Sequence, residues 1–426
     1  TSQFIEPPLK FTNQTHSAPF VTADELQLVA QPPITHHKNH HISVKNMKSL
    51  HVLLVAIIAI LACSCTQRTQ AETARQAPRA TSADTLAAPS QPSVAARPDT
   101  APLRLALVGD IMMGTTFPDD SRGAFLPAKN GAHLFADCDS LLRSADIAAG
   151  NLEGTLLDSG GTPKKCRDPK TCYVFRTPTA YVSNLTHAGF DFLSVANNHA
   201  NDFGATGVTS TARTLQDAGI AYAGMKAGPR TATIVRDGRR IGLAAFAHSS
   251  GTMSVHDLQT LRSTVARLKK DHDIVVVSFH GGAEGPKYSH VPHGPETAFG
   301  EARGDVEKFA HAAVDAGADI VYGHGPHVPR AAELYKDRLI LYSLGNFCTP
   351  YRVSLSGVSG LAPLVEADLA PDGRFLSGQI HSFRQQKGVG PRIDATNAAA
   401  REIRRLSAAD FPASPLKISP SGRLSR

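Results

Sequence analysis

The sequence predicts an α/β domain with mixed sheets over residues 101–390. Apolar runs of strand length alternate there with segments in which apolar residues recur at helical spacing, a pattern typical of α/β domains with buried sheets. Turn signals between some of these runs add antiparallel hairpins to the parallel strands. A third observation points to a site, because five of the predicted strands end in Asp, Glu, Asn or His, most with Gly beside them.

The expected elements follow one another without a linker-like interruption. Strands are predicted where apolar residues run together, at 103–108, 146–149, 190–196, 240–246, 273–279, 319–322 and 338–343. Helices are predicted where apolar residues recur every three or four positions, at 133–144, 178–188, 207–218, 257–270 and 304–316. Hairpin turns are predicted at Asp237-Gly238, Lys336-Asp337 and Asp372-Gly373. The tail 391–426 is expected to form one helix over 395–406 and then an extended coil that lies on the domain.

The segments before the domain differ from it in composition. Residues 1–46 are expected to be an upstream, unstructured segment. Residues 47–65 combine a positive start, a short apolar run and small residues before a cysteine, which indicates a secretory signal too short to span a bilayer. Its ending, Ile60-Leu61-Ala62-Cys63, resembles a bacterial lipoprotein box, in which the cysteine becomes lipidated. An ordinary signal peptide with incidental cysteines is the alternative.

Residues 66–100 are rich in Ala, Pro, Ser, Thr and Gln and contain no aromatic residue. Such a segment cannot bury enough apolar surface to offset its ordering entropy, so a disordered linker is predicted. Behind a lipidated Cys63 this linker would tether the domain to a membrane. We therefore expect an exported protein of the cell envelope, lipid-anchored on the periplasmic side of a membrane.

The net charge of +7 says little about partners. The basic excess lies before residue 103 and after residue 399, and the body between them is nearly neutral. The chain has no stripe of interleaved basic and aromatic residues of the kind that binds nucleic acid, so this class of partner is set aside. Cys166 and Cys172 flank a turn-prone stretch and would meet an oxidising compartment after export, which predicts a local disulfide. A zinc site is the alternative.

Polar side chains gather at the ends of the predicted strands. Ligand sites in α/β folds lie at the carboxyl ends of strands, so we expect these side chains to share one site. Carboxylate, amide and imidazole groups form a mixed ligand set that suits Mn, Fe or Zn. The strand-end candidates are Asp110, Glu153, Asn198, His199, His280, His324 and His327, with Asp202 three residues beyond His199.

These residues also carry a resemblance to a known family. The segments concerned are Gly109-Asp110-Ile111-Met112-Met113-Gly114, Asn151-Leu152-Glu153-Gly154, Ala196-Asn197-Asn198-His199-Ala200, Gly323-His324-Gly325-Pro326-His327 and Tyr342-Ser343-Leu344-Gly345-Asn346-Phe347. In this order, over about 103–350, the chain resembles the CapA family of poly-gamma-glutamate capsule synthesis proteins. The domain of that family is similar to calcineurin-like metallophosphoesterases, which implies a four-layer α-β-β-α sandwich with a centre for one or two divalent ions.

The resemblance also implies a role for each residue that matches a family motif. Its implied ligands are Asp110 and His327 for one ion, Asn198, His280 and His324 for the other, and Glu153 as the bridging carboxylate. His199 would be the general acid that protonates the leaving oxygen, with Asp202 to orient it. Met112 stands where the superfamily has a histidine, which implies that one of the two metal sites is weak, differently selective or empty.

Two functions are consistent with this reading. The first is a metal-dependent, phosphoesterase-like hydrolase that acts in capsule or envelope polymer synthesis on a phosphoester, or on an amide or ester of an anionic polymer. The second is a non-catalytic accessory protein that binds or guides an anionic capsule polymer within a synthesis complex. The long segment 284–305 is interpreted as a substrate-side loop. The expected substrate contacts are Arg176, Glu284, Arg303 and Arg330.

Overall fold

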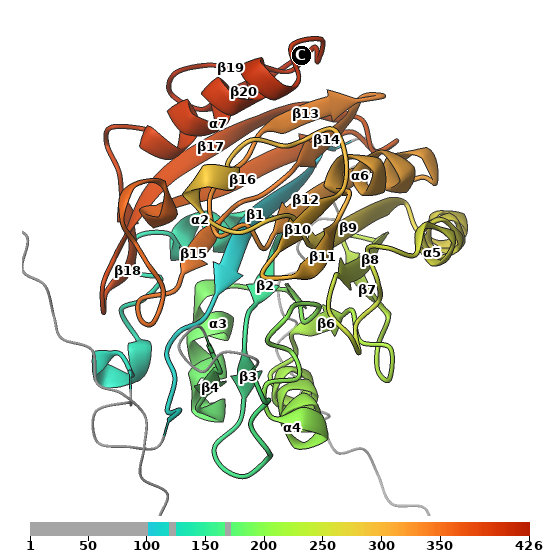
Figure 1. Cartoon of the computed structure of the whole chain (residues 1–426). Helices are drawn as coiled ribbons and strands as arrows, with labels where there is room; N and C mark the ends of the chain where they lie inside the picture. The colour runs from blue at the N-terminus through green and yellow to red at the C-terminus, as the bar shows by residue number, and fades with distance from the viewer. Residues whose placement is uncertain (1–100, 119–124, 167–171) are drawn as a thin grey trace, which may run out of the picture. The chain divides into compact units, whose positions relative to one another are not determined.

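The structure is a computed structural model that describes residues 101–118, 125–166 and 172–426. The predicted signal, Cys63 and the linker fall outside the described residues. The described part forms two large β-sheets, with helices on the outer side of each (Figure 1). Within the described residues no helix is both long enough and apolar enough to cross a membrane.

The larger sheet is mixed and has ten strands in the described chain. Its path is β19-β20-β17-β16-β1-β2-β5-β6, with β15 paired to β1 and β18 paired to β17. Strands β1, β2, β5 and β6 are parallel, whereas β16 and β17 are antiparallel to their neighbours. The strands are β1 Leu103–Ile111, β2 Ile147–Leu152, β5 Phe192–Ser194, β6 Ala221–Ala223, β15 Asn346–Cys348, β16 Leu361–Leu369, β17 Phe375–Gln386, β18 Gly390–Ile393, β19 Lys417–Ile418 and β20 Arg423–Ser425.

The smaller sheet follows the order β13-β14-β12-β9-β8-β7. Its strands are β7 Thr231–Arg236, β8 Arg239–Ala247, β9 Ile274–His280, β12 Ile320–His324, β13 Ala332–Tyr335 and β14 Arg338–Leu341. The three predicted hairpin turns join β7 to β8, β13 to β14 and β16 to β17. Two short pairs complete the strands, β3 Thr155–Leu156 with β4 Arg176–Thr177 and β10 Glu296–Ala298 with β11 Glu301–Gly304.

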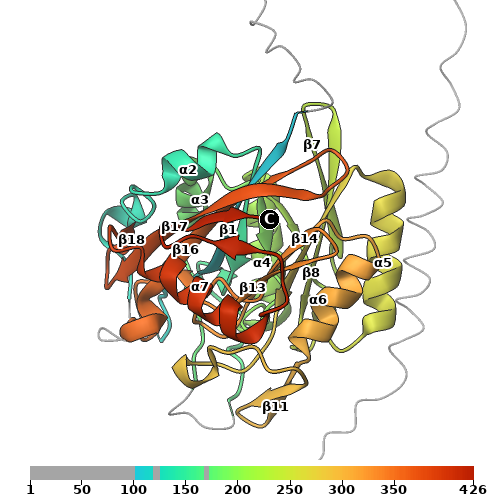
Figure 2. The ribbon, with the colours of Figure 1, turned by 90° about the horizontal axis from the view of Figure 1, so that it is seen from above.

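Three apolar cores separate four layers. The central core lies between the sheets and joins Leu105 and Ile147 of the larger sheet to Leu243 and Val276 of the smaller one. A second core packs α2 Asp139–Ser144, α3 Val182–Ala188 and α4 Gly204–Asp217 against the larger sheet. A third packs α5 Leu258–Asp271 and α6 Val306–Asp315 against the smaller sheet, where Figure 2 shows these two helices side by side. The predicted four-layer α-β-β-α sandwich with mixed sheets is confirmed.

Short helical turns and caps complete the elements. Single 3-10 turns occur at Ala128–Gly131, Thr179–Tyr181, Pro286–Tyr288 and Gly357–Gly360. Helices α5 and α6 begin after an aspartate whose carboxylate accepts a backbone N–H three residues on, at 2.9 Å for Asp257 and 3.0 Å for Asp305. Such caps satisfy backbone donors that the first helical turn leaves unpaired.

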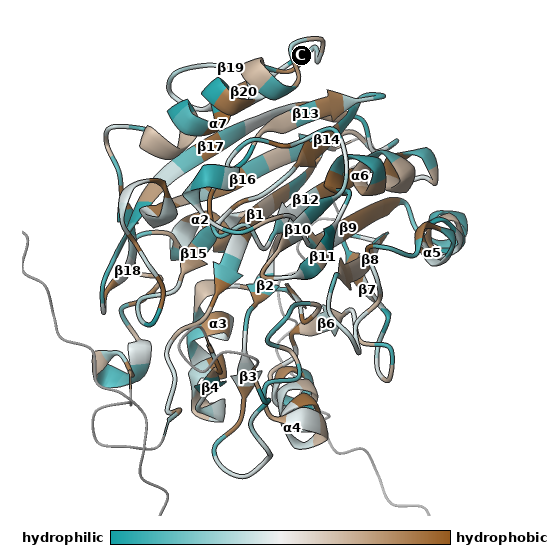
Figure 3. Cartoon of the chain, viewed as in Figure 1, coloured by the Kyte–Doolittle hydropathy of each residue, from teal (hydrophilic) through white to brown (hydrophobic). Residues whose placement is uncertain are grey.

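The C-terminal segment is more regular than the sequence predicts. Helix α7, Ala398–Asp410, places Ile403 in the central core, and Figure 3 shows hydrophilic and hydrophobic residues alternating along this helix. The coil expected after this helix instead contains β19 and β20, and β20 pairs with β17. The segment buries Leu424 completely, but its strands are too short to show a periodic pattern in the sequence.

Candidate metal centre

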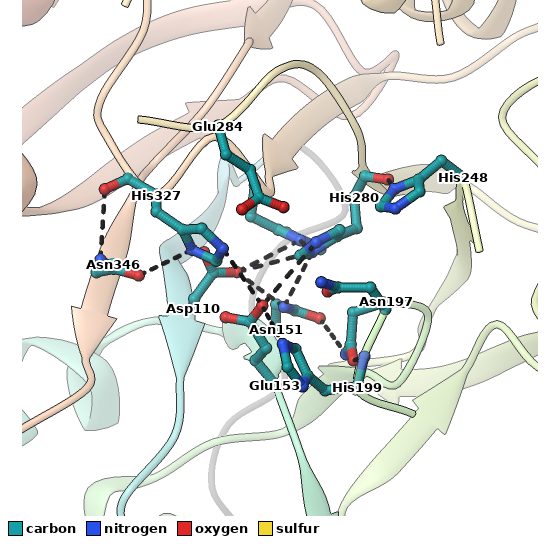
Figure 4. A network of polar contacts seen from close by, with 12 residues as sticks. Asp110, Asn151, Glu153, Asn197, His199, His248, His280, Glu284, His327 and Asn346 are labelled. Atoms are coloured by element: carbon teal, nitrogen blue, oxygen red, sulfur yellow. Dashed lines mark hydrogen bonds and ion pairs between the residues drawn. The ribbon is translucent and has the colours of Figure 1, made fainter. Parts of the chain in front are cut away.

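Strands from both sheets end at one cluster of polar side chains (Figure 4). Asp110 lies within β1, beside Asn151 of β2 and Asn346 of β15 in the strand register. His280 ends β9 and His324 ends β12, where the two residues are register partners. The position of β1 requires glycine before Asp110, because a Cβ on Gly109 would lie 1.9 Å from the carbonyl oxygen of Gly345.

One group of candidate ligands consists of Asp110, His280 and His324, all fully buried. Asp110 Oδ1 lies 3.6 Å from His324 Nδ1 and 3.9 Å from His280 Nδ1. Ser278 Oγ contacts the other ring nitrogen of His324 at 2.9 Å, which fixes the orientation of this imidazole. Burial lowers the pKa of His324 to about 4, and burial together with His324 holds the pKa of His280 well below its usual value. Both imidazoles are therefore neutral near pH 7, the form that binds metals.

A second group consists of Asp110, Glu153 and His327. His327 Nδ1 lies 3.0 Å from Asp110 Oδ2, and its Nε2 lies 3.6 Å from Glu153 Oε1. Burial and the nearby Asp110 raise the pKa of Glu153 well above its usual value. Burial by itself would lower the pKa of His327, but Glu153 and Asp110 raise it well above the usual range. The group thus places two carboxylates around one imidazole, and a bound cation would take the place of the protons that these raised pKa values retain.

Asp110 is common to both groups, whereas the family resemblance gives the bridging position to Glu153. Asn151 Nδ2 donates to Asp110 Oδ1 at 2.8 Å and so orients the shared carboxylate. Glu153 is also central, since its Oε1 lies 3.9 Å from His199 Nε2 and 4.0 Å from His280 Nε2. Asp110 and Glu153 thus each lie within 4.0 Å of His327 on one side and His280 on the other.

The donor atoms fit a divalent cation. Glu153 Oε1, Asn198 Oδ1 and His280 Nε2 are buried without a hydrogen-bond partner. Buried polar atoms left without a partner are costly, and native proteins rarely keep several of them in one place. A bound cation would satisfy such atoms, and carboxylate, amide and imidazole donors suit Mn, Fe or Zn. Asn198, whose Oδ1 is among these buried atoms, therefore remains a ligand candidate.

His199 and Asp202 lie together beside the cluster. His199 Nδ1 lies 2.9 Å from Asp202 Oδ2, and the backbone N–H of Phe175 donates to the same oxygen at 2.7 Å. The Phe175 ring packs on the imidazole with 4.4 Å between the ring centroids. The other ring nitrogen, Nε2, faces Glu153. This arrangement gives His199 one nitrogen held by a carboxylate and one directed at the candidate metal groups.

Several residues of the site were missed by the sequence analysis. Asn346 Oδ1 lies 3.0 Å from His327 Nδ1, and Asn197 Nδ2 donates to Asn151 Oδ1 at 3.1 Å. These three asparagines stand inside the motifs that carry the family resemblance, so closer attention to those motifs would have found them. Lys164 contacts Asp202 from a loop that has no periodic pattern, and no sequence signal identifies it.

The predicted substrate contacts divide into two sets. Glu284 and Arg303 form an ion pair with each other, and Arg303 also lies 3.3 Å from Glu301. Figure 4 shows the Glu284 carboxylate directed toward His327 and the cluster, and its negative charge raises the pKa of His327. Burial raises the pKa of Glu284, but His327 and Arg303 outweigh it and leave that pKa lowered. Glu284 therefore remains a candidate contact at the edge of the site.

The structure places two of the predicted substrate contacts, Arg330 and Arg176, in buried positions. Arg330 is buried, and its two Nη atoms donate to the Glu296 carboxylate at 2.9 and 2.8 Å and to the Ala283 carbonyl at 3.0 Å. Arg176 is also buried, and its Nε donates to Thr116 Oγ1 at 2.9 Å. Glu296 neutralises Arg330 inside the protein, so this guanidinium group links two loop segments. A substrate contact of Arg176 stays a prediction.

Replacing Arg330 by Met should lower the free energy of unfolding by about 3–5 kcal/mol, because it leaves the buried Glu296 carboxylate without its partner. Urea unfolding followed by circular dichroism measures this. The matched control is Lys336→Met, which breaks the exposed ion pair with Asp315 and should leave stability unchanged. A double Arg330→Met/Glu296→Leu variant should recover part of the loss. Equal stability of Arg330→Met and wild type would contradict the supporting role.

The four layers and the two ligand groups at the sheet ends define a class of protein. The chain has an α/β fold of four layers with a buried His, Asp and Glu cluster at the strand ends. The sequence model of a family described as bacterial capsule synthesis protein PGA_cap matches residues 104–351. The chain belongs to this family, and the resemblance to CapA proteins is confirmed.

Two relatives and one solved structure illustrate the likeness. The chain is 30% identical over 263 residues to the capsule biosynthesis protein CapA of Bacillus anthracis, across 58% of this chain and 59% of that protein. It is 30% identical over 261 residues to the PGA biosynthesis protein CapA of Bacillus subtilis (strain 168), across 58% and 63%. The chain thus spans less than two thirds of either relative. The calcineurin-like phosphoesterase YfkN from Bacillus subtilis gives a TM-score of 0.39 at 11% identity, across 74% of this chain and 99% of that structure.

Proposed function

We propose that this protein is a metal-dependent hydrolase that acts in capsule or envelope polymer synthesis. The observation that carries the proposal is the pair of ligand groups that share Asp110 beside the His199–Asp202 pair. The shared carboxylate matters because a bridging ligand lets two cations act on one reacting group. The second group keeps three ligands although Met112 replaces a histidine, which favours catalysis over a purely structural role.

In the proposed hydrolysis, one set of residues would hold the metal ions and another would transfer the proton. Asp110, Glu153, His280, His324 and His327 would hold one or two divalent ions, with Asn198 as a further ligand. When bound, such ions supply Lewis-acid activation of water and neutralise charge on phosphoryl oxygens. As water attacks phosphorus and the bond to the leaving oxygen breaks, His199 would give its Nε2 proton to that oxygen. Asp202 would stabilise the protonated imidazole through Nδ1.

We also propose that the protein works outside the cytoplasm, at the membrane surface. The signal-like segment 47–65 and Cys63 support this proposal, as does the disulfide that joins Cys166 to Cys172, because such bonds persist in oxidising compartments. The proposed substrate is a phosphoester, or an ester or amide of an anionic envelope polymer. Its proposed partners are the other components of a capsule synthesis complex.

Metal analysis combined with a hydrolysis assay tests this function. The purified full-length chain should bind Mn²⁺ and hydrolyse 4-nitrophenyl phosphate or bis(4-nitrophenyl) phosphate. Dialysis against EDTA should abolish the activity, and added Mn²⁺ should restore it. A chain that binds Mn²⁺ neither before nor after dialysis and cleaves neither ester would contradict the hydrolase. Binding of polyglutamate by that same metal-free chain would instead favour the accessory function.

A further inference from the structure

Lys164, in the loop between β3 and β4, contacts the His199–Asp202 pair. Its backbone N–H donates to the Asp202 carbonyl at 2.8 Å. Its ammonium lies 2.6 Å from Asp202 Oδ1 and donates to the Asn198 carbonyl at 3.2 Å. Lys164 therefore contacts both ends of the short segment that carries the ligand candidate Asn198 and the proposed acid His199.

Lys164 forms an ion pair with the buried Asp202 carboxylate. The Asp202 side chain is fully buried, and its Oδ2 is occupied by His199 and by the Phe175 N–H. Its Oδ1 lies 2.6 Å from the Lys164 ammonium. Among the described residues, Lys164 and His199 are the two groups within ion-pair distance of this carboxylate, and Lys164 alone faces Oδ1. A buried carboxylate without a counter-charge is strongly unfavourable, and the Lys164 ammonium provides this counter-charge on the side of Asp202 that faces away from the imidazole.

The loop that carries Lys164 is fastened to the same region. The disulfide between Cys166 and Cys172 begins two residues further along the chain. Both cysteines pack on a small apolar cluster that contains Phe203, the residue directly after Asp202. The neighbouring Lys165 is exposed. The Lys164 ammonium thus contacts Asp202 close to a disulfide that packs on Phe203, whereas the Lys165 side chain is exposed to solvent.

We propose that Lys164 is a positioning residue for His199. By holding the Asp202 carboxylate and the Asn198 carbonyl, it keeps the imidazole oriented with Nδ1 toward Asp202 and Nε2 toward Glu153. The inference rests on the proposed function, in which His199 protonates the leaving oxygen. Lys164 Nζ also lies 3.3 Å from His199 Nδ1, but the 2.9 Å contact of that nitrogen with Asp202 is shorter and favours a proton on Nδ1.

Rates with two leaving groups test the proposal. A poor leaving group needs a proton in the transition state and a good one does not, so Lys164→Met should slow phenyl phosphate hydrolysis about 100-fold. The rate with 2,4-dinitrophenyl phosphate should fall less than about threefold, with KM nearly unchanged for both esters. Lys164→Arg should recover most of the phenyl phosphate rate, because it keeps the positive charge. The matched control, Lys165→Met, should behave as wild type with both esters.

A spectroscopic measurement separates this proposal from the proposed function. In ¹⁵N-histidine NMR spectra of the full chain, the His199 signals, assigned through a His199→Gln variant, should show that Nδ1 keeps its proton while Nε2 is the nitrogen that gains and loses one. In Lys164→Met the signals should shift toward the other tautomer or divide between the two. If wild type cleaves no ester, the hydrolase is contradicted while these spectra still decide the role of Lys164. Unchanged His199 signals, or equal slowing with both esters, would overturn the positioning role.

Discussion

Replacing Asp110 by Asn should reduce hydrolysis about 1,000-fold or more and remove most of the bound Mn²⁺. The substitution keeps the side chain's shape but removes the one carboxylate common to both ligand groups. Weakened charge neutralisation in the transition state is worth several kcal/mol, and each 1.4 kcal/mol corresponds to about tenfold in rate. Metal analysis of the purified variant, together with kcat for 4-nitrophenyl phosphate in excess Mn²⁺, measures both effects.

This loss should not come from unfolding. Asp110 and Glu153 are buried carboxylates that repel each other, but Asp110 also lies 3.0 Å from His327 and attracts that imidazole. These two effects oppose each other, so the metal-free variant should unfold at a urea concentration close to that of wild type. The matched control is Asp217→Asn on the exposed side of α4, where the carboxylate lies 3.5 Å from Arg213. Its rate and metal content should equal those of wild type. An Asp110→Asn variant with full Mn²⁺ content and activity would rule out the shared-ligand role.

Replacing His199 by Gln should lower kcat by about 100- to 10,000-fold, the range that a positioned general acid contributes. Bound Mn²⁺ should stay at the wild-type amount, because His199 belongs to neither of the two ligand groups. The separation between rate and metal content distinguishes an acid from a ligand. Steady-state kinetics with phenyl phosphate and metal analysis on the same preparation make the comparison.

A histidine outside the site provides the control for this substitution. His187 is exposed near the end of α3, and His187→Gln should change neither the rate nor the metal content. A His199→Gln variant that loses Mn²⁺ would instead identify the imidazole as a ligand, and its distance of 3.9 Å from Glu153 would have to shorten. A variant with the wild-type rate would remove His199 from the mechanism.

Much of the fold was predictable because strand and helix patterns are local. The runs that predict β1, β8, β9 and β12 fall within a few residues of the observed strands, since buried strands appear as continuous apolar segments. For the long strands β16 and β17, the sequence patterns predict only the turn between them and neither strand. β17 mixes buried and exposed positions along its length, so its residues show neither a clear alternation nor an apolar run.

The sequence by itself determined which side chains could form the site. Asp110, Glu153, His280, His324 and His327 stand where apolar strands end, and that change from apolar to polar residues is visible along the chain. Chain order also carried the family resemblance, since its motifs follow one another over the matched region.

Only the tertiary structure decided how these side chains are paired. It makes Asp110 the shared carboxylate, buries Arg330 against Glu296 and brings Lys164 to Asp202 across 38 positions of the sequence. Charges act through space and depend on burial, so a sequence can name the ionisable residues without stating which of them meet. Residue type and strand position are properties of the chain, but the charge partner of each group is a property of the folded sheets.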